Sequence, residues 1–231
     1  MKGFINKLKQ LKAVRFFLCF IRIPLIYLFL RGHIRKKAGL SVDAKGLYVP
    51  WLTYPMIDYL ENLDTANYTI FEFGSGASTL WWARKAKKVI AVEMEKDWCD
   101  QVKQLLPDNA DIYHCPNSEN YPDIINSFDI PFDVIVVDGA ERYRSAQNAI
   151  SKLTQQGIII LDNSDWYPNT AKLLVEHEFV QIDFYGFTPN NSFPHCSSLF
   201  FKHPAALSKR TQTFKPVIGG KQIPGGALDD G

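Results

Sequence analysis

The chain has 231 residues but only four cysteines, and these form no pair at a recognisable spacing. The four are Cys19, Cys99, Cys115 and Cys196, with no C-x-x-C motif and no zinc-ligand pattern among them. We therefore expect neither a disulfide framework nor a structural zinc site. Free thiols in a reducing compartment are the expected state.

Acidic residues are missing from the start of the chain. Residues 1–42 hold ten Lys/Arg and no Asp or Glu, whereas the remainder carries 16 Lys/Arg against 24 Asp/Glu. A basic arm on a mildly acidic body predicts an electrostatic partner for the arm alone. It also argues against a nucleic-acid-binding body.

The arm contains the most hydrophobic stretch of the chain, residues 13–30. As a helix it would reach only about 27 Å, and Arg15 and Arg22 would offset its apolar residues, so we do not predict a membrane span. The two arginines share one helical face, which suits a helix lying in the surface of an anionic membrane. The alternative is packing on the body or on a second subunit in a homodimer.

Two further features of the arm bear on whether it is a signal peptide and whether its helix is continuous. Basic residues, "RGHIRKK", follow where a signal peptide needs small residues for cleavage, so we expect a cytoplasmic protein, peripheral at the inner face of the membrane. Pro24 should kink or break the helix.

The body alternates apolar runs with amphipathic stretches. Strands are predicted over residues 68–73, 88–93, 111–115, 132–139, 157–163, 179–187 and 197–202, and helices over 54–63, 78–85, 96–106, 144–154 and 170–177. This order predicts an α/β fold, a doubly wound Rossmann-like and mostly parallel seven-stranded sheet with an antiparallel C-terminal hairpin. We divide the chain into the arm (1–42), a body (43–205) and a flexible Gly/Pro-rich tail (206–231).

The loop after the first strand predicts a nucleotide-type ligand. Gly74 and Gly76 allow close backbone approach, Ser75 and Ser78 are small, and Ser78 or Thr79 can cap the next helix. Glu93 ends the second strand, where a carboxylate grips the hydroxyls of a ribose. These residues together indicate an adenosine-containing ligand.

A third glycine is absent from this loop. Thr79 stands where a G-x-G-x-x-G dinucleotide motif needs it, and Glu72 in the first strand would repel a pyrophosphate. The same carboxylate suits the positive sulfonium and amino groups of S-adenosylmethionine. An NAD(P)-dependent oxidoreductase remains the alternative enzyme, and a catalytically silent membrane-associated interaction module the alternative of another class.

The motifs "EFGSGAST", "VE", "FDVIVVDG" and "GIIILDN" resemble those of class I S-adenosylmethionine-dependent methyltransferases. The segment "VPWLTYPMIDYL" is similar to one found in a bacterial subgroup of that family. The resemblance covers residues 48–202 and implies a methyltransferase that binds the donor through Glu72, Gly74 and Gly76 at the methionine part and Glu93 at the ribose. It also places Asn117 near the adenine.

Acidic residues end the fourth and fifth predicted strands. Asp138, Asp162 and Asn163 offer oxygen ligands suited to Mg²⁺ or Ca²⁺, and the trio resembles the magnesium ligands of catechol-type O-methyltransferases. Alternatively, Asp138 contacts donor or acceptor without a metal. Glu141 and His195 are the other predicted catalytic residues, as general bases, and an arginine of "GAERYRS" can hold an anionic acceptor.

The motifs of nucleic-acid methylases are missing. No Pro-Pro-aromatic sequence follows the fourth strand, and no Pro-Cys nucleophile is present there. We therefore expect no nucleic-acid partner, and predict O-methylation of a small-molecule, sugar or lipid-linked hydroxyl.

Overall fold

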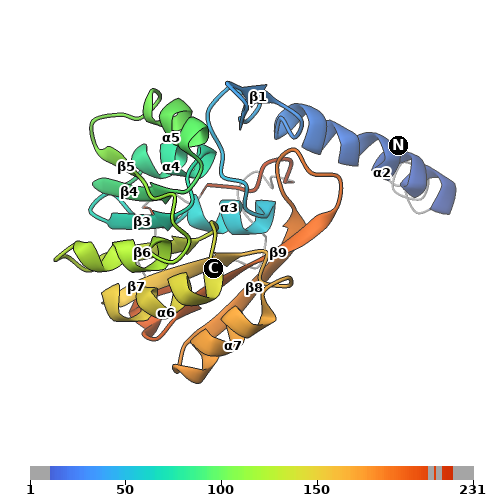
Figure 1. Ribbon diagram of the computed structural model, residues 1–231. Coiled ribbons are helices and arrows are strands. Elements are labelled where there is room, and N and C mark those ends of the chain that lie inside the picture. Colours follow the sequence, from blue (N-terminus) through green and yellow to red (C-terminus); the bar gives the residue numbers. More distant parts are fainter. Residues whose placement is uncertain (1–10, 208–210, 212–214, 221–231) are drawn as a thin grey trace.

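The computed structural model describes residues 11–207, 211 and 215–220 (Figure 1). Residues 1–10 of the predicted arm and most of the predicted tail lie outside this range. The predicted domain boundaries stay a prediction.

One seven-stranded sheet forms the centre of the molecule, as predicted. Its order is β5(Ala110–His114), β4(Lys88–Glu93), β3(Thr69–Phe73), β6(Phe132–Val137), β7(Leu153–Asp162), β9(Pro194–Phe201), β8(Val180–Phe187). The first five strands are parallel, and β9 pairs antiparallel with both β7 and β8. The predicted α/β class and C-terminal hairpin are therefore confirmed.

Helices cover both faces of this sheet (Figure 1). One face carries α3(Tyr54–Leu60), α4(Ala77–Ala83) and α5(Lys96–Lys103), and the other carries the 3₁₀ helix η2(Tyr121–Ser127), α6(Arg142–Lys152) and α7(Pro168–Glu176). Alternation along β3 serves both layers, because Ile70 packs on the first side and Phe71 and Phe73 on the second. The central strands are thus buried on both faces, as their continuous apolar runs predict.

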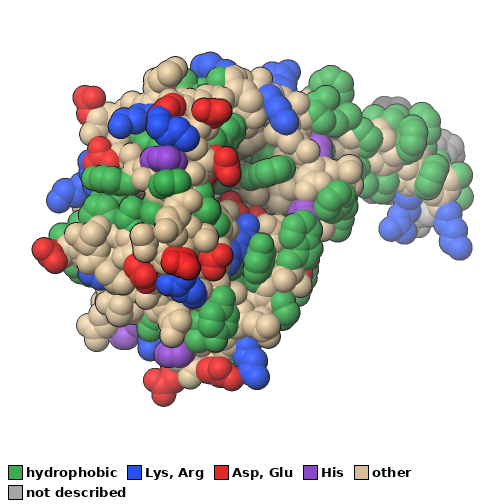
Figure 2. Space-filling model, in the orientation of Figure 1, with side chains coloured by type: hydrophobic (Ala, Val, Ile, Leu, Met, Phe, Trp, Pro, Cys, Tyr) green, Lys and Arg blue, Asp and Glu red, His purple; other side chains and the backbone are tan. Residues whose placement is uncertain are grey.

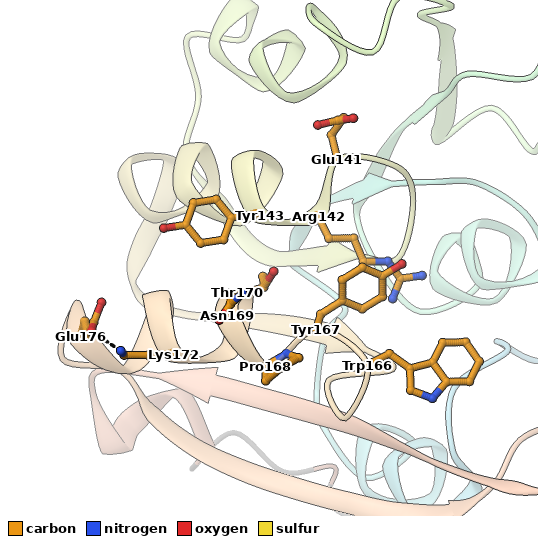
Figure 3. Close-up of a pocket in the computed structure, with 10 residues that line it drawn as sticks. All are labelled: Glu141, Arg142, Tyr143, Trp166, Tyr167, Pro168, Asn169, Thr170, Lys172 and Glu176. Carbon is orange, nitrogen blue, oxygen red and sulfur yellow. Dashed lines mark ion pairs between the residues drawn. The ribbon is translucent and has the colours of Figure 1, made fainter.

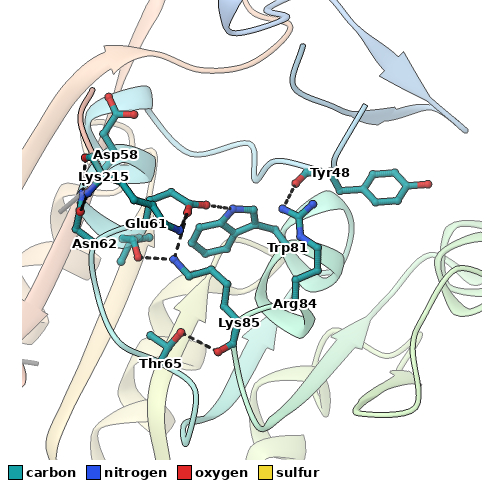
Figure 4. Close-up of polar contacts among 10 residues, drawn as sticks. Tyr48, Asp58, Glu61, Asn62, Thr65, Trp81, Arg84, Lys85 and Lys215 are labelled. Carbon is teal, nitrogen blue, oxygen red and sulfur yellow. Dashed lines mark hydrogen bonds and ion pairs between the residues drawn. The ribbon is translucent and has the colours of Figure 1, made fainter. Parts of the chain in front are cut away.

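Polar contacts fasten α3 to α4, the helix that starts at the glycine loop (Figure 4). The Trp81 indole N–H donates to Glu61 at 2.7 Å, and the Lys85 ammonium donates to the Leu60 carbonyl at 2.7 Å. Burial lowers the pKa of Lys85 to about 8, although the nearby Glu61 carboxylate favours its charged form. These contacts hold α4 near its C-terminal end, whereas the glycine loop lies at its start.

The arm is helical from Lys12 to Leu30 and projects from the body (Figure 1). It comprises α2(Lys12–Pro24) and one stretch of π-helix, η1(Leu25–Leu30). Pro24 therefore does not break the helix, and its position coincides with the change to wider turns, since proline has no N–H to donate and its ring crowds the preceding turn. A small hairpin, β1(Lys36–Lys37) and β2(Leu40–Ser41), follows.

The strand β7, the fifth of the predicted strands, is longer than predicted. We expected it to begin at Gly157, but β7 starts at Leu153, with a shift in register against Phe132 and Val134. The polar residues of "TQQ" hide this extension from a search for apolar runs.

Candidate functional site

A cavity of about 410 Å³ opens at the carboxyl ends of β3, β4 and β6. This is where ligands bind in open α/β sheets. Its walls are Glu72, Phe73, Gly74, Ser75, Ser78, Glu93, Met94, Glu95, Trp98, Tyr121, Asp138, Gly139 and Ala140. We call it the donor cavity. Figure 2 shows the hollow in this face of the molecule, with acidic side chains along it.

Two glycines bring the loops after β3 and β6 together at the floor of the cavity. Gly74 has φ of +100°, in the region that favours glycine. A Cβ on Gly139 would lie 2.1 Å from the Tyr121 hydroxyl and 2.7 Å from the Gly74 nitrogen. A side chain at Gly139 would therefore collide with Tyr121 and with the loop after β3, and a side chain at Gly74 would crowd the loop after β6.

Glu72 is buried in the wall of the cavity, and no cationic side chain among the described residues pairs with it. Only 1% of the residue is exposed, and neither carboxylate oxygen has a hydrogen bond from the described residues. Burial raises its pKa to about 8, and the nearby Thr79 and Ser78 hydroxyls oppose this only in part. A buried acid of this kind is complementary to a cationic ligand group.

Glu93 faces the same cavity from the end of β4. Its carboxylate accepts hydrogen bonds from the Ser75 hydroxyl at 2.8 Å and from the Met94 backbone N–H at 2.8 Å. The indole N–H of Trp98, on α5, donates to the Ser75 carbonyl at 2.9 Å. This hydrogen bond fastens the glycine loop to α5. Glu93 is thus held in a fixed orientation by the loop that it faces.

The predicted donor residues separate into those that line the cavity and those that do not. Glu72, Gly74, Ser75, Ser78, Glu93 and Asp138 line it. Thr79 is buried, and its hydroxyl accepts the Gly76 backbone N–H at 3.1 Å, which gives it a structural role at the start of α4. Asn117 is exposed and does not line the donor cavity, so its predicted contact with adenine gains no support.

Sequence reasoning missed seven residues of the wall. These are Phe73, Met94, Glu95, Trp98, Tyr121, Gly139 and Ala140. Met94 and Glu95 directly follow the predicted ribose acid, and their place in the chain was a usable signal. Trp98 and Tyr121 reach the cavity from α5 and η2, which no local pattern indicates.

A smaller cavity of about 140 Å³ adjoins the donor cavity. The two share Ser75, Ser78, Trp98 and Asp138. Its other walls include Gly76, Trp51, Asn190 and the β1–β2 hairpin. Asp138 is the one titratable residue that lines both cavities, and its side chain is 29% exposed.

The side chain of Arg142 occupies the space in which we predicted a metal ion. It donates to Asp138 Oδ1 at 3.0 Å, to Asn163 Oδ1 at 3.3 Å and to the Asp162 carbonyl. Its guanidinium also lies 4.4 Å from the centre of the Tyr167 ring. The guanidinium of Arg142 thus supplies the hydrogen bonds and the positive charge at these oxygens.

This arrangement corrects the predicted magnesium site. The Asp162 carboxylate turns away and accepts the Ser197 hydroxyl at 2.6 Å. Within residues 11–207, 211 and 215–220, no group of three His, Cys, Asp or Glu side chains is arranged to hold a metal. The likeness to catechol-type enzymes is therefore not supported.

The two acids at this edge, the half-buried Asp138 and the buried Asp162, are hard to ionise. Burial raises the pKa of Asp138 to about 6, although Arg142 favours its charged form. Burial, and then the neighbouring Asp138, raise the pKa of Asp162 well above its usual value. Of the two, only Asp138 faces a cavity.

Glu141 lies in a different cavity, of about 650 Å³, between α6 and α7 (Figure 3). This cavity is also lined by Arg142, Trp166 and Tyr167, and is larger than the donor cavity but shares no residue with it. Glu141 has φ of +50° and is exposed at the start of α6. Its predicted role as a base stays a prediction that this position does not favour.

His195, the other predicted base, is enclosed by aromatic rings. It is 4% exposed, and the rings of Trp166 and Phe193 each lie 4.9 Å from its own. One ring nitrogen pairs with the Asn191 amide, and Nδ1 has no partner among the described residues. Its catalytic role also stays a prediction.

Comparison with solved structures identifies proteins of similar fold. No protein-family model and no curated protein matches the sequence. Among solved structures, the precorrin-6y C5,15-methyltransferase of Geobacter metallireducens aligns over 75% of this chain and 96% of its own, with a TM-score of 0.55 and 11% identity. The O-methyltransferase TomG of Streptomyces achromogenes, in complex with S-adenosylmethionine, aligns over 82% and 95%, with a TM-score of 0.53 and 13% identity.

The chain therefore has the fold of class I S-adenosylmethionine-dependent methyltransferases. The spermidine synthase of Thermotoga maritima has a similar structure, with a TM-score of 0.53 and 13% identity over 78% of this chain and 70% of its own. At such identities the fold alone does not determine the reaction.

Proposed function

We propose that this protein is an S-adenosylmethionine-dependent methyltransferase. The observation that carries the proposal is the buried, unpartnered carboxylate of Glu72 in the wall of the donor cavity. An unpaired buried acid costs stability, and a cationic ligand group would relieve that cost. The fold of the two methyltransferases described above supports the same conclusion.

The residues of the cavity suit the two ends of this donor. Glu72 would neutralise the positive methionine end, next to the close approach of Gly74 and Gly139. Glu93 would accept hydrogen bonds from the ribose hydroxyls. A dinucleotide fits less well, because its pyrophosphate would bring negative charge toward Glu72.

We propose that the acceptor is a hydroxyl group, of a small molecule, a sugar or a lipid-linked compound, and that it occupies the adjoining cavity. Bound S-adenosylmethionine would supply an activated methyl group. Asp138, which faces both cavities, would accept the hydroxyl proton as the acceptor oxygen bonds to the methyl carbon and the bond from that carbon to the donor sulfur breaks, which would leave S-adenosylhomocysteine. A pKa near 6 is suited to that role at neutral pH. Arg142 holds this carboxylate in place, and no metal ion is needed in the scheme.

Calorimetric titration of the full chain with S-adenosylmethionine and S-adenosylhomocysteine tests the proposal. We expect micromolar binding that Glu72→Gln weakens and that EDTA leaves unchanged. Binding of NADH in place of both compounds would favour the oxidoreductase. If the folded protein binds none of these three compounds, the result would favour the silent interaction module.

A further inference from the structure

The arm exposes more apolar surface than a helix in water normally does. Phe16, Phe17 and Phe20 are 74%, 61% and 67% exposed, and no residue of α2 is buried. Figure 2 shows hydrophobic side chains over much of the side of the arm that faces the viewer, with basic side chains on its lower edge. Lys12–Leu30 is long and apolar enough to cross a membrane, judged by length and composition.

The charges of α2 lie on one narrow stripe. Lys12, Arg15 and Arg22 are spaced by three and by seven residues, which places them on one side of an α-helix. The phenylalanines occupy the wide remainder of the circumference. Since residues 1–42 contain no acid, nothing in the arm neutralises the stripe.

The base of the arm is fixed to the body. The ring of Tyr27 lies 5.5 Å from that of Tyr54 and 5.6 Å from that of Phe187. Arg31 is 7% exposed and forms an ion pair of 2.6 Å with Asp58. The exposed part of the arm therefore starts from an anchored point and has a set direction.

We propose that α2 lies in the surface of an anionic bilayer, with its phenylalanines among the acyl chains and its basic stripe toward the headgroups. Charge decides between the possible occupants: a second arm would bring the same unneutralised cations, whereas anionic lipid complements them. Arg22 decides the orientation, because a spanning Lys12–Leu30 helix would place it near the middle of the hydrocarbon.

Vesicle sedimentation of the full-length protein tests the occupant. We expect binding to phosphatidylcholine vesicles that contain about one-third phosphatidylglycerol, and at least tenfold weaker binding to phosphatidylcholine alone. The double variants Phe16→Ser/Phe20→Ser and Arg15→Gln/Arg22→Gln should each weaken binding at least tenfold. Tyr185→Ser, which removes an equally exposed aromatic from β8, should leave it unchanged.

Two outcomes would overturn the proposal. One is a full-length protein that ignores anionic vesicles, or binds them equally well with either double variant. The other is a stable dimer in light scattering that Phe16→Ser/Phe20→Ser converts to a monomer, which would assign the arm to a second copy. Binding of S-adenosylhomocysteine, measured on the same samples, tests the proposed function separately from membrane binding.

Depth measurements test the orientation. Phe20→Trp and Phe29→Trp place a fluorophore at the middle and near the end of the helix. In the proposed orientation, lipids that carry a quencher at different depths should quench both at the same shallow depth. A deep position for Phe20→Trp with a shallow one for Phe29→Trp would overturn the surface orientation and indicate a span.

Discussion

The guanidinium of Arg142, at the start of α6, donates at 3.0 Å to Oδ1 of Asp138, which lies four residues earlier in the loop after β6. The same group bonds the Gly139 carbonyl at 3.1 Å and stacks on Tyr167. One side chain thereby connects the loops after β6 and β7. It also supplies the positive charge at the position for which sequence reasoning predicted a metal.

Replacing this cation should destabilise the protein. Arg142→Ala leaves Asp138 and the buried Asp162 without a positive neighbour, and we expect a loss of about 3 kcal/mol or more in the free energy of unfolding. The loss should grow as pH rises through about 6, where Asp138 ionises. Urea unfolding measures it. Arg144→Ala, which removes an exposed ion pair with Asp123, is the control and should change stability by less than about 1 kcal/mol.

The ligand-free protein should lose stability between about pH 4.5 and pH 8 because of Glu72. The unfolded chain releases this proton near pH 4.5 and the folded protein only near pH 8, so ionisation favours unfolding across that window. Glu72→Gln removes the effect, and at pH 8 the variant should be more stable by a few kcal/mol at most. Urea unfolding at pH 5 and pH 8 gives the comparison. Equal pH dependence in both proteins would contradict the assignment.

Donor binding should release a proton from the same residue. Below pH 8 the empty site holds Glu72 largely protonated, and a cationic ligand favours the carboxylate. Affinity for S-adenosylmethionine should therefore rise with pH up to about 8. Calorimetry at pH 6.5 in buffers of different ionisation enthalpy counts the proton directly. Glu72→Gln should bind more weakly and without proton release.

Substitutions at Glu93 and Asn117, the residues predicted to contact the ribose and the adenine, should have different effects on donor affinity. Glu93→Gln should weaken S-adenosylhomocysteine binding about tenfold or more, because a charged acceptor for ribose hydroxyls is lost. Asn117→Ala should change affinity less than about twofold, since Asn117 does not line the donor cavity. Titration of both variants distinguishes the structural placement from the family resemblance.

Gly139→Ala tests whether the two loops must approach. A Cβ at this position would meet the Tyr121 hydroxyl and the Gly74 nitrogen. We expect a lower melting temperature and loss of donor binding, because the floor of the cavity has to move. A variant of unchanged affinity would show that the loops separate easily.

The sheet and most of the donor site could be predicted from local pattern. Apolar runs locate the strands, and an acid or glycine at a strand end shares an edge with its neighbours in any parallel sheet. The direction of Arg142 could not be predicted in this way. Its sequence suggested a contact with an acceptor anion, whereas the structure turns it onto the protein's own Asp138. His195 illustrates the same limit, because Trp166 and Phe193, which enclose it, belong to different loops.

The pairing of β3 has a consequence for the order of folding. Glu72 lies between Ala91 on β4 and Val136 on β6. During synthesis at about 5–20 residues per second, several seconds separate the appearance of Glu72 from that of Val136. Until then the strand has a neighbour on one side only, and water can reach the carboxyl group. We expect the nascent chain to keep Glu72 ionised, and its shift toward the protonated form to mark the completion of the sheet.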